Sequence, residues 1–334
     1  MLYFFKETIN LSKLAKAFPS SAKLESNYRR IQRFLSDRHA VDFDHVAWFV
    51  IQLFGFLETD YYLTFDRTHW KWGKKNINIL VLAVVYKGIA IPVYWILLNK
   101  KGHSNTRERI ALMKRFISQF GKKQIIKLLA DREFVGKKWF QWLKSEGIDF
   151  AIRIKKNTKV TNSRGDVVQV QHLCRFLKVG ETLVLNAARK ILEVDVYLSA
   201  LRLQDGTLLI VATGKPCEDA IASYALRWQI ETLFSCLKSR GFNFEDTHVT
   251  DRRRIKRLLV VAVLAFCWAH RVGEWQHENI KPIKVKKHQR LAKSIFRLGL
   301  DIIKEKLFKR VYSSENTLNL LFSFLEFKRL CGSS

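Results

Sequence analysis

The segment Tyr224–Lys238 carries polar side chains at a spacing that suits chemistry on one helix face. The pattern Y-x-x-R-x-x-x-E-x-x-x-x-x-x-K is formed by Tyr224, Arg227, Glu231 and Lys238. At about 100° per residue, the last three fall within roughly 60° of the first. The opposite side carries an apolar stripe of Leu226, Ile230, Leu233 and Leu237. One acid, two cations and a phenol suit metal-assisted chemistry on a phosphate chain, and a solvated helix face is the open alternative.

Two aspartates follow apolar segments that read as strands. Asp66 comes directly after Tyr61–Phe65, and Asp131 directly after Ile125–Ala130. Binding sites of α/β sheets collect at strand ends. If the two strands are neighbours, both carboxylates meet there, and Glu231 completes a cluster of three. For each aspartate alone, a turn or helix-cap role is an equal alternative.

A cluster of three carboxylates repels itself unless divalent cations neutralise it. We expect two Mg²⁺ or Mn²⁺ ions, about 4 Å apart, that activate a water or a 3′-hydroxyl at a phosphodiester. The five cysteines lack any C-x-x-C pair, and the nine histidines show no ligand spacing. Carboxylate ligation of a hard cation is therefore expected rather than a zinc site.

The order of predicted elements gives the fold. Three strands, Tyr61–Phe65, Ile77–Tyr86 and Ile89–Leu98, precede the helix Asn105–Gly121, in which Asn105 and Glu108 resemble a capping pair. A strand at 125–130, a helix at 137–145 and a strand at 150–154 follow. The order β-β-β-α-β-α-β is that of ribonuclease-H-like folds, which predicts an α/β mixed sheet with helices on both faces.

Changes in texture divide the sequence into five predicted segments. These are a helical DNA-binding module (1–58), the first segment of the catalytic core (59–157), a separate β-rich insertion (158–211), the second segment of the catalytic core (212–280) and a helical C-terminal segment (281–334). The first module contains Leu11–Phe18, Tyr28–Leu35 and Val41–Leu57, and it is predicted to bind DNA because Tyr28–Leu35 carries three arginines on one face that could lie on DNA, with an ordinary solvated face as the alternative. The amphipathic stretch Leu291–Phe308 is expected to help pair two protomers.

The charge balance points to a polyanionic partner. The 334 residues contain 59 Lys and Arg against 30 Asp and Glu, a net charge of +29. An excess of this size favours nucleic acid over anionic membrane. The longest apolar run, Leu258–Ala269, is too short to cross a bilayer and predicts a buried helix. The scattered, odd number of cysteines suits a reducing cytoplasm.

Together these residues resemble a known family. Asp66 in F-D-R-T, Asp131 in L-L-A-D-R-E-F and Glu231 within the Y-R-E-K signature resemble the DDE transposases of bacterial insertion sequences, and in particular the insertion-sequence-four family. The resemblance covers nearly the whole chain. It implies a cut-and-paste enzyme that cleaves DNA at the ends of its element and transfers the strands to target DNA.

The resemblance also implies roles for single residues. Asp66, Asp131 and Glu231 become the catalytic triad and the ligands of both metal ions. DNA contacts are expected from Tyr224, Arg227, Trp228, Lys238 and Arg132. Trp228 is the candidate for stacking on a displaced base, with packing against the sheet as the alternative. Independently of the resemblance, Glu133 competes with Asp131 for its role, but it lies two residues further from the strand end and is expected to brace Arg132 instead.

Partners and location follow from the same resemblance. They are double-stranded DNA, as terminal inverted repeats and target, a second protomer in a synaptic dimer, and the bacterial cytoplasm at the nucleoid. The sequence begins almost directly on the helical module, which further helical sequence usually precedes in the family, so the segment that recognises the DNA ends is expected to be short or truncated. Two alternatives stay open, a ribonuclease-H-like nuclease without strand transfer and an inactive DNA-binding relic.

Overall fold

The computed structural model describes residues 7–18, 20–287, 289–309 and 323, and these form two compact units. One unit comprises Met1–Gly55, Trp70–Lys75 and Leu233–Ser334, and the other comprises Phe56–His69 and Asn76–Thr232. Residues 1–6, 19, 288, 310–322 and 324–334 are not described. The predicted C-terminal segment (281–334) is therefore described up to residue 309, except for residue 288, and beyond it only at residue 323.

An eight-stranded mixed sheet organises the second unit, in the order β3-β2-β1-β4-β5-β10-β9-β8. Strand β1 pairs in parallel with β4 and β4 with β5, whereas β2 and β3 are antiparallel. The strands are β1 Tyr61–Trp72, β2 Lys75–Tyr86, β3 Ile89–Leu97, β4 Ile125–Ala130, β5 Phe150–Ile154, β8 Thr182–Ile191, β9 Val194–Arg202 and β10 Leu208–Thr213. The predicted ribonuclease-H-like order is confirmed, and so is the neighbourhood of the first and fourth strands.

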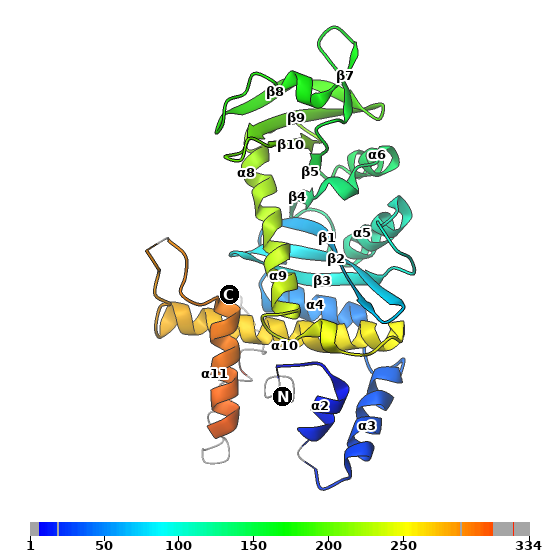
Figure 1. Ribbon diagram of the computed structural model, residues 1–334, viewed down its shortest axis with the longest axis vertical. Coiled ribbons are helices and arrows are strands. Elements are labelled where there is room, and N and C mark those ends of the chain that lie inside the picture. Colours follow the sequence, from blue (N-terminus) through cyan, green and yellow to red (C-terminus); the bar gives the residue numbers. More distant parts are fainter. Residues whose placement is uncertain (1–6, 19, 288, 310–322, 324–334) are drawn as a thin grey trace, which may run out of the picture. The chain divides into compact units, whose positions relative to one another are not determined.

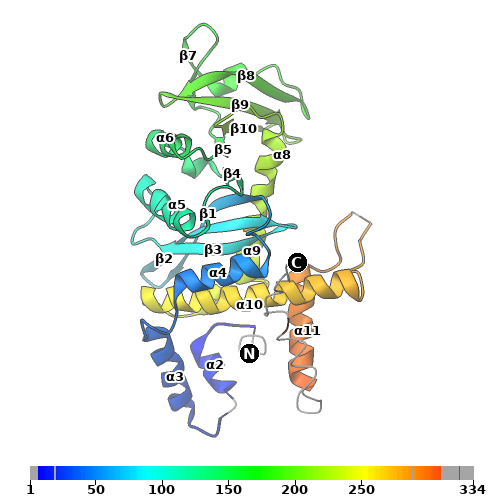
Figure 2. The same cartoon turned by 180° about the vertical axis from the view of Figure 1, so that it is seen from behind.

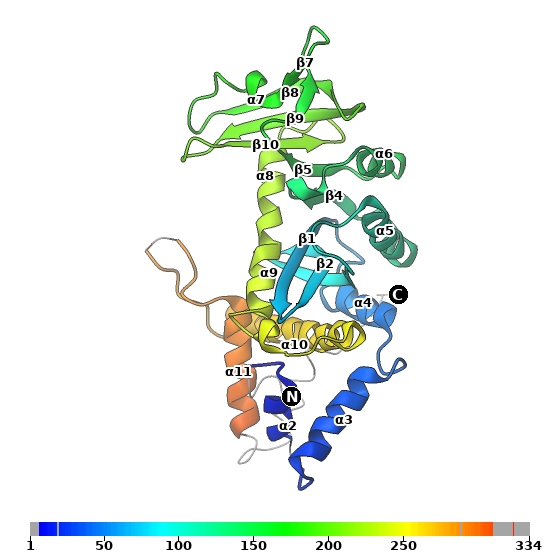
Figure 3. The same ribbon diagram turned by 45° about the vertical axis from the view of Figure 1, so that its right-hand side comes forward.

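Helices lie on both faces of this sheet (Figure 3). On one side are α5 (Thr106–Phe120) and α6 (Lys137–Ser145), and on the other is α8 (Ala220–Ala225). The predicted start of α5 is confirmed as a capping box, in which the side chains of Asn105 and Glu108 each accept a backbone N–H of the other. The α8 face is closed by apolar packing of Leu129, Ala151, Val211, Ala220 and Tyr224.

The region predicted as a separate insertion is rich in strands, but most of them continue the main sheet. Strand β10 pairs with β5 in antiparallel register from Ile210 opposite Ile154 to Thr213 opposite Ala151, and β9 and β8 follow outward. Within the described residues, the short pair β6 (Lys159–Thr161) and β7 (Val167–Gln169), followed by α7 (Val170–Leu173), forms a sheet of its own. Alternating hydrophobicity predicts strands but carries no information about which strand pairs with β5.

Helices dominate the first unit, called the helical unit below, whose helices are coloured blue and yellow to orange in Figure 1. They are α2 (Leu11–Lys16), α3 (Leu24–Ser36), α4 (Phe43–Leu53), α10 (Arg252–Asn279) and α11 (Ile295–Lys309). The apolar run Leu258–Ala269 lies inside α10 and is largely buried, as predicted. Among the described residues, no helix has the length and apolar character needed to span a membrane.

Helices α10 and α11 cross each other (Figure 2), and their contact depends on two glycines. A Cβ atom added to Gly299 would lie 1.7 Å from the carbonyl oxygen of Ala269, and one added to Gly273 would lie 2.0 Å from that of Ile295. Both neighbours are backbone atoms of the other helix, so the two helices must separate before any side chain fits.

This close approach predicts the opposite of the usual effect of Gly→Ala in a helix. An alanine ordinarily stabilises a helix by about 1 kcal/mol. Gly299→Ala should instead destabilise the helical unit by about 2 kcal/mol through overpacking, measured by chemical denaturation. Gly136→Ala is the control, because its Cβ would meet its nearest atom, Trp139 Cβ, at 3.8 Å. An unchanged or raised stability of Gly299→Ala would show that the helices are not in backbone contact.

Candidate active site

The register of two parallel strands brings the two predicted aspartates together. The pairing of β1 with β4 ends with Phe65 opposite Ala130, so Asp66 and Asp131 are the next residues along the two chains. One detail of the prediction is wrong, because β1 does not stop before Asp66 but runs on to Trp72. The strand continues since β2, its partner on the other side, is equally long. What ends at Asp66 is the pairing with β4.

Asp66 is a carboxylate largely removed from solvent, with its side chain 14% exposed. Its Oδ2 lies 2.9 Å from Nη1 of Arg227, and its Oδ1 accepts the backbone N–H of Arg67 at 2.6 Å. Burial raises the pKa of Asp66 to about 7, and the nearby carboxylates of Glu231 and Glu133 act in the same direction. The two donors, Arg227 and the Arg67 N–H, oppose this shift.

Arg227 joins the predicted acids into one group. Its Nη1, which pairs with Asp66, also lies 3.5 Å from Oε1 of Glu231. Asp131 Oδ1 accepts the hydroxyl proton of Tyr224 at 3.2 Å, and the Arg227 guanidinium lies 5.8 Å from the centre of the Tyr224 ring. Burial lowers the pKa of Arg227, but Tyr224 and the three carboxylates outweigh burial and raise it. The guanidinium is therefore a permanent positive charge among three acids.

Two side-chain groups in this set remain well defined as donors. Burial raises the pKa of Tyr224 to about 12, so its phenol stays protonated and donates to Asp131 at neutral pH. The Nε of Arg227 is buried and has no acceptor among the described residues. An unpartnered buried donor on a charged group leaves part of its hydrogen-bonding capacity for a ligand.

The segment predicted as a single helix consists of three consecutive helical elements. Tyr224 lies in α8, Arg227 in a 3₁₀ turn (Leu226–Trp228) and Glu231 in α9 (Gln229–Leu237). These three side chains contact the same group of acids or belong to it, and Ile230 of the predicted apolar stripe is fully buried. The 3₁₀ turn advances about 120° per residue rather than 100°, which a uniform helical wheel does not anticipate.

Lys238 is not among the residues that the structure brings together here. It follows the end of α9 and belongs to the helical unit, where its Nζ lies 2.8 Å from Glu245 Oε1 and 5.8 Å from the centre of the Trp70 ring. The predicted DNA contact of Lys238 stays a prediction.

Trp228 does not pack against the sheet. Its side chain is 67% exposed, and the Arg227 guanidinium lies 5.9 Å from its ring centre. The packing alternative for Trp228 is therefore wrong, and its ring remains accessible for stacking on a flat partner.

The chemistry of the donor set fits a hard divalent cation. Asp66, Asp131 and Glu231 offer only carboxylate oxygens, the ligands that Mg²⁺ and Mn²⁺ prefer. Across the described ranges, however, no three His, Cys, Asp or Glu side chains are arranged to hold a metal ion. Arg227 instead supplies the positive charge that Asp66 and Glu231 require. Metal binding thus needs these carboxylates to exchange the guanidinium for the cation.

A fourth acid, Glu133, lies near the ends of the paired strands, and its partner differs from the prediction. Glu133 does not brace Arg132. Its two oxygens each lie 3.3 Å from Arg67, at Nε and Nη2, and Oε2 also lies 3.0 Å from His103 Nδ1. The 3₁₀ turn Arg132–Phe134 directs Glu133 toward β1. A signal existed in the sequence, since Arg67 and Glu133 follow closely after the two strand segments that pair.

A cavity of about 770 Å³ opens beside Asp131. It is lined by His103, Asp131, Arg132, Glu133, Val135, Lys155 and Thr158. Arg132 and Lys155 form no ion pair within the described part of the chain and face this space as cations. One of the three acids is therefore reachable by an anionic substrate.

The range that holds these residues matches a family model. The model described as "Transposase DDE domain" matches residues 51–268 of the 334. The chain belongs to the DDE transposase family. Asp66, Asp131 and Glu231 all fall within the matched range. The finer assignment to the insertion-sequence-four family and its Y-R-E-K signature stays a prediction.

A solved transposase structure is also similar to this chain. It is the cryo-EM structure of a piggyBac transposase synaptic complex with hairpin DNA, with 12% sequence identity and a TM-score of 0.39. The match covers 83% of this chain, which spans 59% of the length of that protein. No curated protein matches the sequence at a significant level.

The Glu133–Arg67 pair predicts a stability effect at the active site. Both side chains are nearly buried, at 15% and 10% exposure. Glu133→Gln should lower the free energy of unfolding by about 2 kcal/mol, because Arg67 keeps its buried charge but loses a charged acceptor. Urea denaturation measures the change.

The matched control is Glu193→Gln, which removes an ion pair with Lys137 at a site where Glu193 is 79% exposed. Its denaturation midpoint should equal that of the unmodified protein, since exposed pairs contribute little. Equal midpoints for both variants would mean that Glu133 does not support the strand ends.

Proposed function

We propose that this chain is a transposase that cleaves DNA at the ends of its element and joins them to target DNA with the help of divalent metal ions. One observation carries the proposal. Three acids from β1, the end of β4 and α9 lie around a single buried arginine, within the range that matches the transposase domain.

In this proposal Asp66, Asp131 and Glu231 hold two Mg²⁺ or Mn²⁺ ions. When bound, such ions activate a water or a 3′-hydroxyl and stabilise the oxygen that leaves the phosphorus. Before the carboxylates can ligate, Asp66 must lose the proton that its raised pKa retains. Arg227 is then released from its carboxylate partners.

The freed guanidinium is suited to the phosphate that reacts. Arg227 has an unpartnered Nε as well as the Nη1 that it now shares between two carboxylates. A guanidinium binds two phosphate oxygens in a fixed geometry, which holds the phosphodiester in line for attack. Tyr224 keeps Asp131 oriented by donating to it, and the exposed Trp228 offers a surface for a displaced base.

The remaining elements of the proposal concern partners. The net charge of +29 supports double-stranded DNA, as terminal repeats and as target. Joining two ends requires two protomers, so we place the chain in a synaptic homodimer, at the nucleoid of a bacterial cytoplasm.

Removal of any one of the three acids should abolish cleavage. Asp66→Asn, Asp131→Asn and Glu231→Gln should each reduce cleavage of a DNA end in Mg²⁺ by about 10³-fold or more, because metal stabilisation of the transition state is worth several kcal/mol. Gel assays of labelled end DNA measure the rate, and gel shifts measure binding, which should persist.

Asp195→Asn is the matched control, because Asp195 is 54% exposed and pairs with Lys190 on the surface. It should cleave at the unmodified rate. Full cleavage by Asp131→Asn would refute the assignment of this site. Incubation of pre-cleaved ends with plasmid separates the functions, since a nuclease without strand transfer gives no joined product.

The raised pKa of Asp66 predicts a pH dependence for metal binding. Its ordinary value is 3.8 and its value in the fold is about 7, so the metal-free fold retains a proton over this window. The contribution of protonated Asp66 to the stability of the metal-free fold is fully present below its ordinary pKa, and it is lost as the pH rises through about 7. Since binding expels the proton, Mn²⁺ affinity should weaken about tenfold per pH unit below about pH 7 and level off above it.

Calorimetry with Mn²⁺ alone across this range measures the effect, with Asp195→Asn as a control that keeps the same profile. A constant affinity from weakly acid to weakly alkaline pH would mean that Asp66 is not a ligand. No Mn²⁺ binding at any pH, even with DNA present, would favour the inactive DNA-binding relic.

A further inference from the structure

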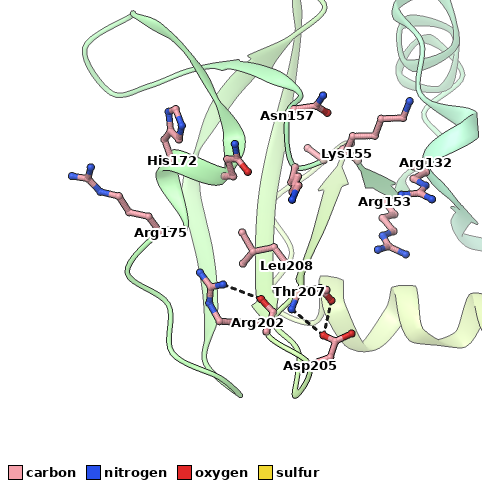
Figure 4. A pocket seen from close by; sticks show the side chains of 14 residues that line it. Arg132, Arg153, Lys155, Asn157, His172, Arg175, Arg202, Asp205, Thr207 and Leu208 are labelled. Carbon is pink, nitrogen blue, oxygen red and sulfur yellow. Dashed lines mark hydrogen bonds between the residues drawn. The ribbon is translucent and has the colours of Figure 1, made fainter.

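A second cavity, of about 800 Å³, lies where β5, α7 and the β9–β10 turn meet, all within the sheet-containing unit. Its lining is basic. The Lys and Arg residues around it are Arg132, Arg153, Lys155, Lys156, Arg175 and Arg202, and His172 also lines it. Figure 4 shows Arg132, Arg153 and Lys155 on the side of the core strands, and His172 and Arg175 on the opposite side.

Most of these cations are not neutralised by the protein. For Lys155, Lys156 and Arg175, no ion pair or side-chain hydrogen bond is present among the described residues. The one acid in the lining is Asp205, and its Oδ1 already accepts from the backbone N–H and the hydroxyl of Thr207, at 2.9 and 2.7 Å. Asp205 offsets only one of the positive charges, and the cations that remain repel one another, so this cavity suits an anion with several charges.

The wall of the cavity is fixed before any ligand arrives. Arg202 uses its guanidinium on backbone carbonyls, with Nε 2.6 Å from the oxygen of Leu177 and Nη1 3.0 Å from that of Gly206. This arginine ties the β9–β10 turn to the loop after α7. Arg202 is therefore a component of the wall, and the remaining cations are available to a ligand.

The basic cavity shares lining residues with the cavity beside Asp131. Arg132 and Lys155 line both this cavity and the one that contains Asp131. Arg153, in β5, also acts electrostatically on Tyr224, the residue that donates to Asp131. An anion that extends from Asp131 across Arg132 and Lys155 enters the basic cavity without leaving the protein surface.

The lining also indicates which portion of a nucleic acid is bound. It contains no Phe, Tyr or Trp on which a base stacks, whereas Lys and Arg are the residues that hold phosphates. We propose that this cavity binds consecutive backbone phosphates of the DNA strand that continues beyond the phosphate at Asp131, independently of its sequence. The direction of that strand relative to the acid site rests on the proposed function.

The test measures DNA binding without chemistry. The probe is a fluorescent DNA duplex with a single-stranded extension, titrated by anisotropy in EDTA over a series of KCl concentrations. The variant is Lys156→Ala with Arg175→Ala, because these residues line the basic cavity and not the cavity at Asp131. Its slope of log affinity against log salt should be shallower by about 1.4 to 1.8, since each phosphate contact contributes about 0.7 to 0.9.

The control is Lys114→Ala with Lys123→Ala, two exposed lysines of the same unit that line neither cavity. Equal slopes for the two double variants would overturn the proposal. A loss that differs between probe sequences would also overturn it. Unfolding midpoints check that both variants fold, and Lys156→Gln with Arg175→Gln replaces the first pair if its midpoint falls.

A neutral backbone locates the contact on the DNA. Methylphosphonates in the extension should weaken binding to the unmodified protein but have little further effect on the cavity variant, because both changes remove the same contacts. Equal weakening in both proteins would show that these phosphates bind elsewhere. All measurements are metal-free, so a protein that binds as described but never cleaves would refute the proposed function and leave this inference standing.

Discussion

The contact between Asp66 and Arg227 is the interaction on which the candidate active site depends. A carboxylate with so little exposure is costly to ionise, and two further acids stand close enough to raise its pKa. The guanidinium offsets this cost only because the helical path from α8 to α9 delivers it against the edge of the β1–β4 pairing. Ala220 and Tyr224 pack this helical path against the apolar face of the sheet, and this packing fixes the position of Arg227.

The same pair gives the site two alternative sources of positive charge. One arginine is shared by two carboxylates, with one short and one long contact. In the proposed function, divalent cations replace the guanidinium at the same oxygens, and the reacting phosphate then becomes the better partner for the arginine. Under that proposal metal and substrate favour each other, because the metal occupies the carboxylates and the phosphate occupies the arginine.

Much of this arrangement was predictable from the sequence, because it follows from local patterns. Apolar runs ending in Asp66 and Asp131 predicted two strands, and their parallel pairing placed the aspartates side by side. The spacing of Tyr224, Arg227 and Glu231 predicted their common direction, despite the 3₁₀ turn among them. What escaped prediction depends on pairings between distant segments. The length of β1 is set by β2, and the partner of Glu133 is set by the turn after β4. The pairing of β10 with β5, which attaches the insertion to the main sheet, likewise could not be predicted from composition. Alternating apolar and polar residues predict a strand with one buried face, but they do not indicate which strand it pairs with.

That attachment has a geometric consequence. Since β10 and β9 are hydrogen-bonded onto β5, which itself pairs with β4, the basic cavity and Asp131 are held in one continuous sheet. Strands lie about 4.8 Å apart, so β10 stands about 10 Å from β4, a separation that backbone hydrogen bonds keep constant. If DNA binds as proposed, the sheet therefore sets a constant distance between the phosphates held in the basic cavity and the phosphate that reacts at Asp131.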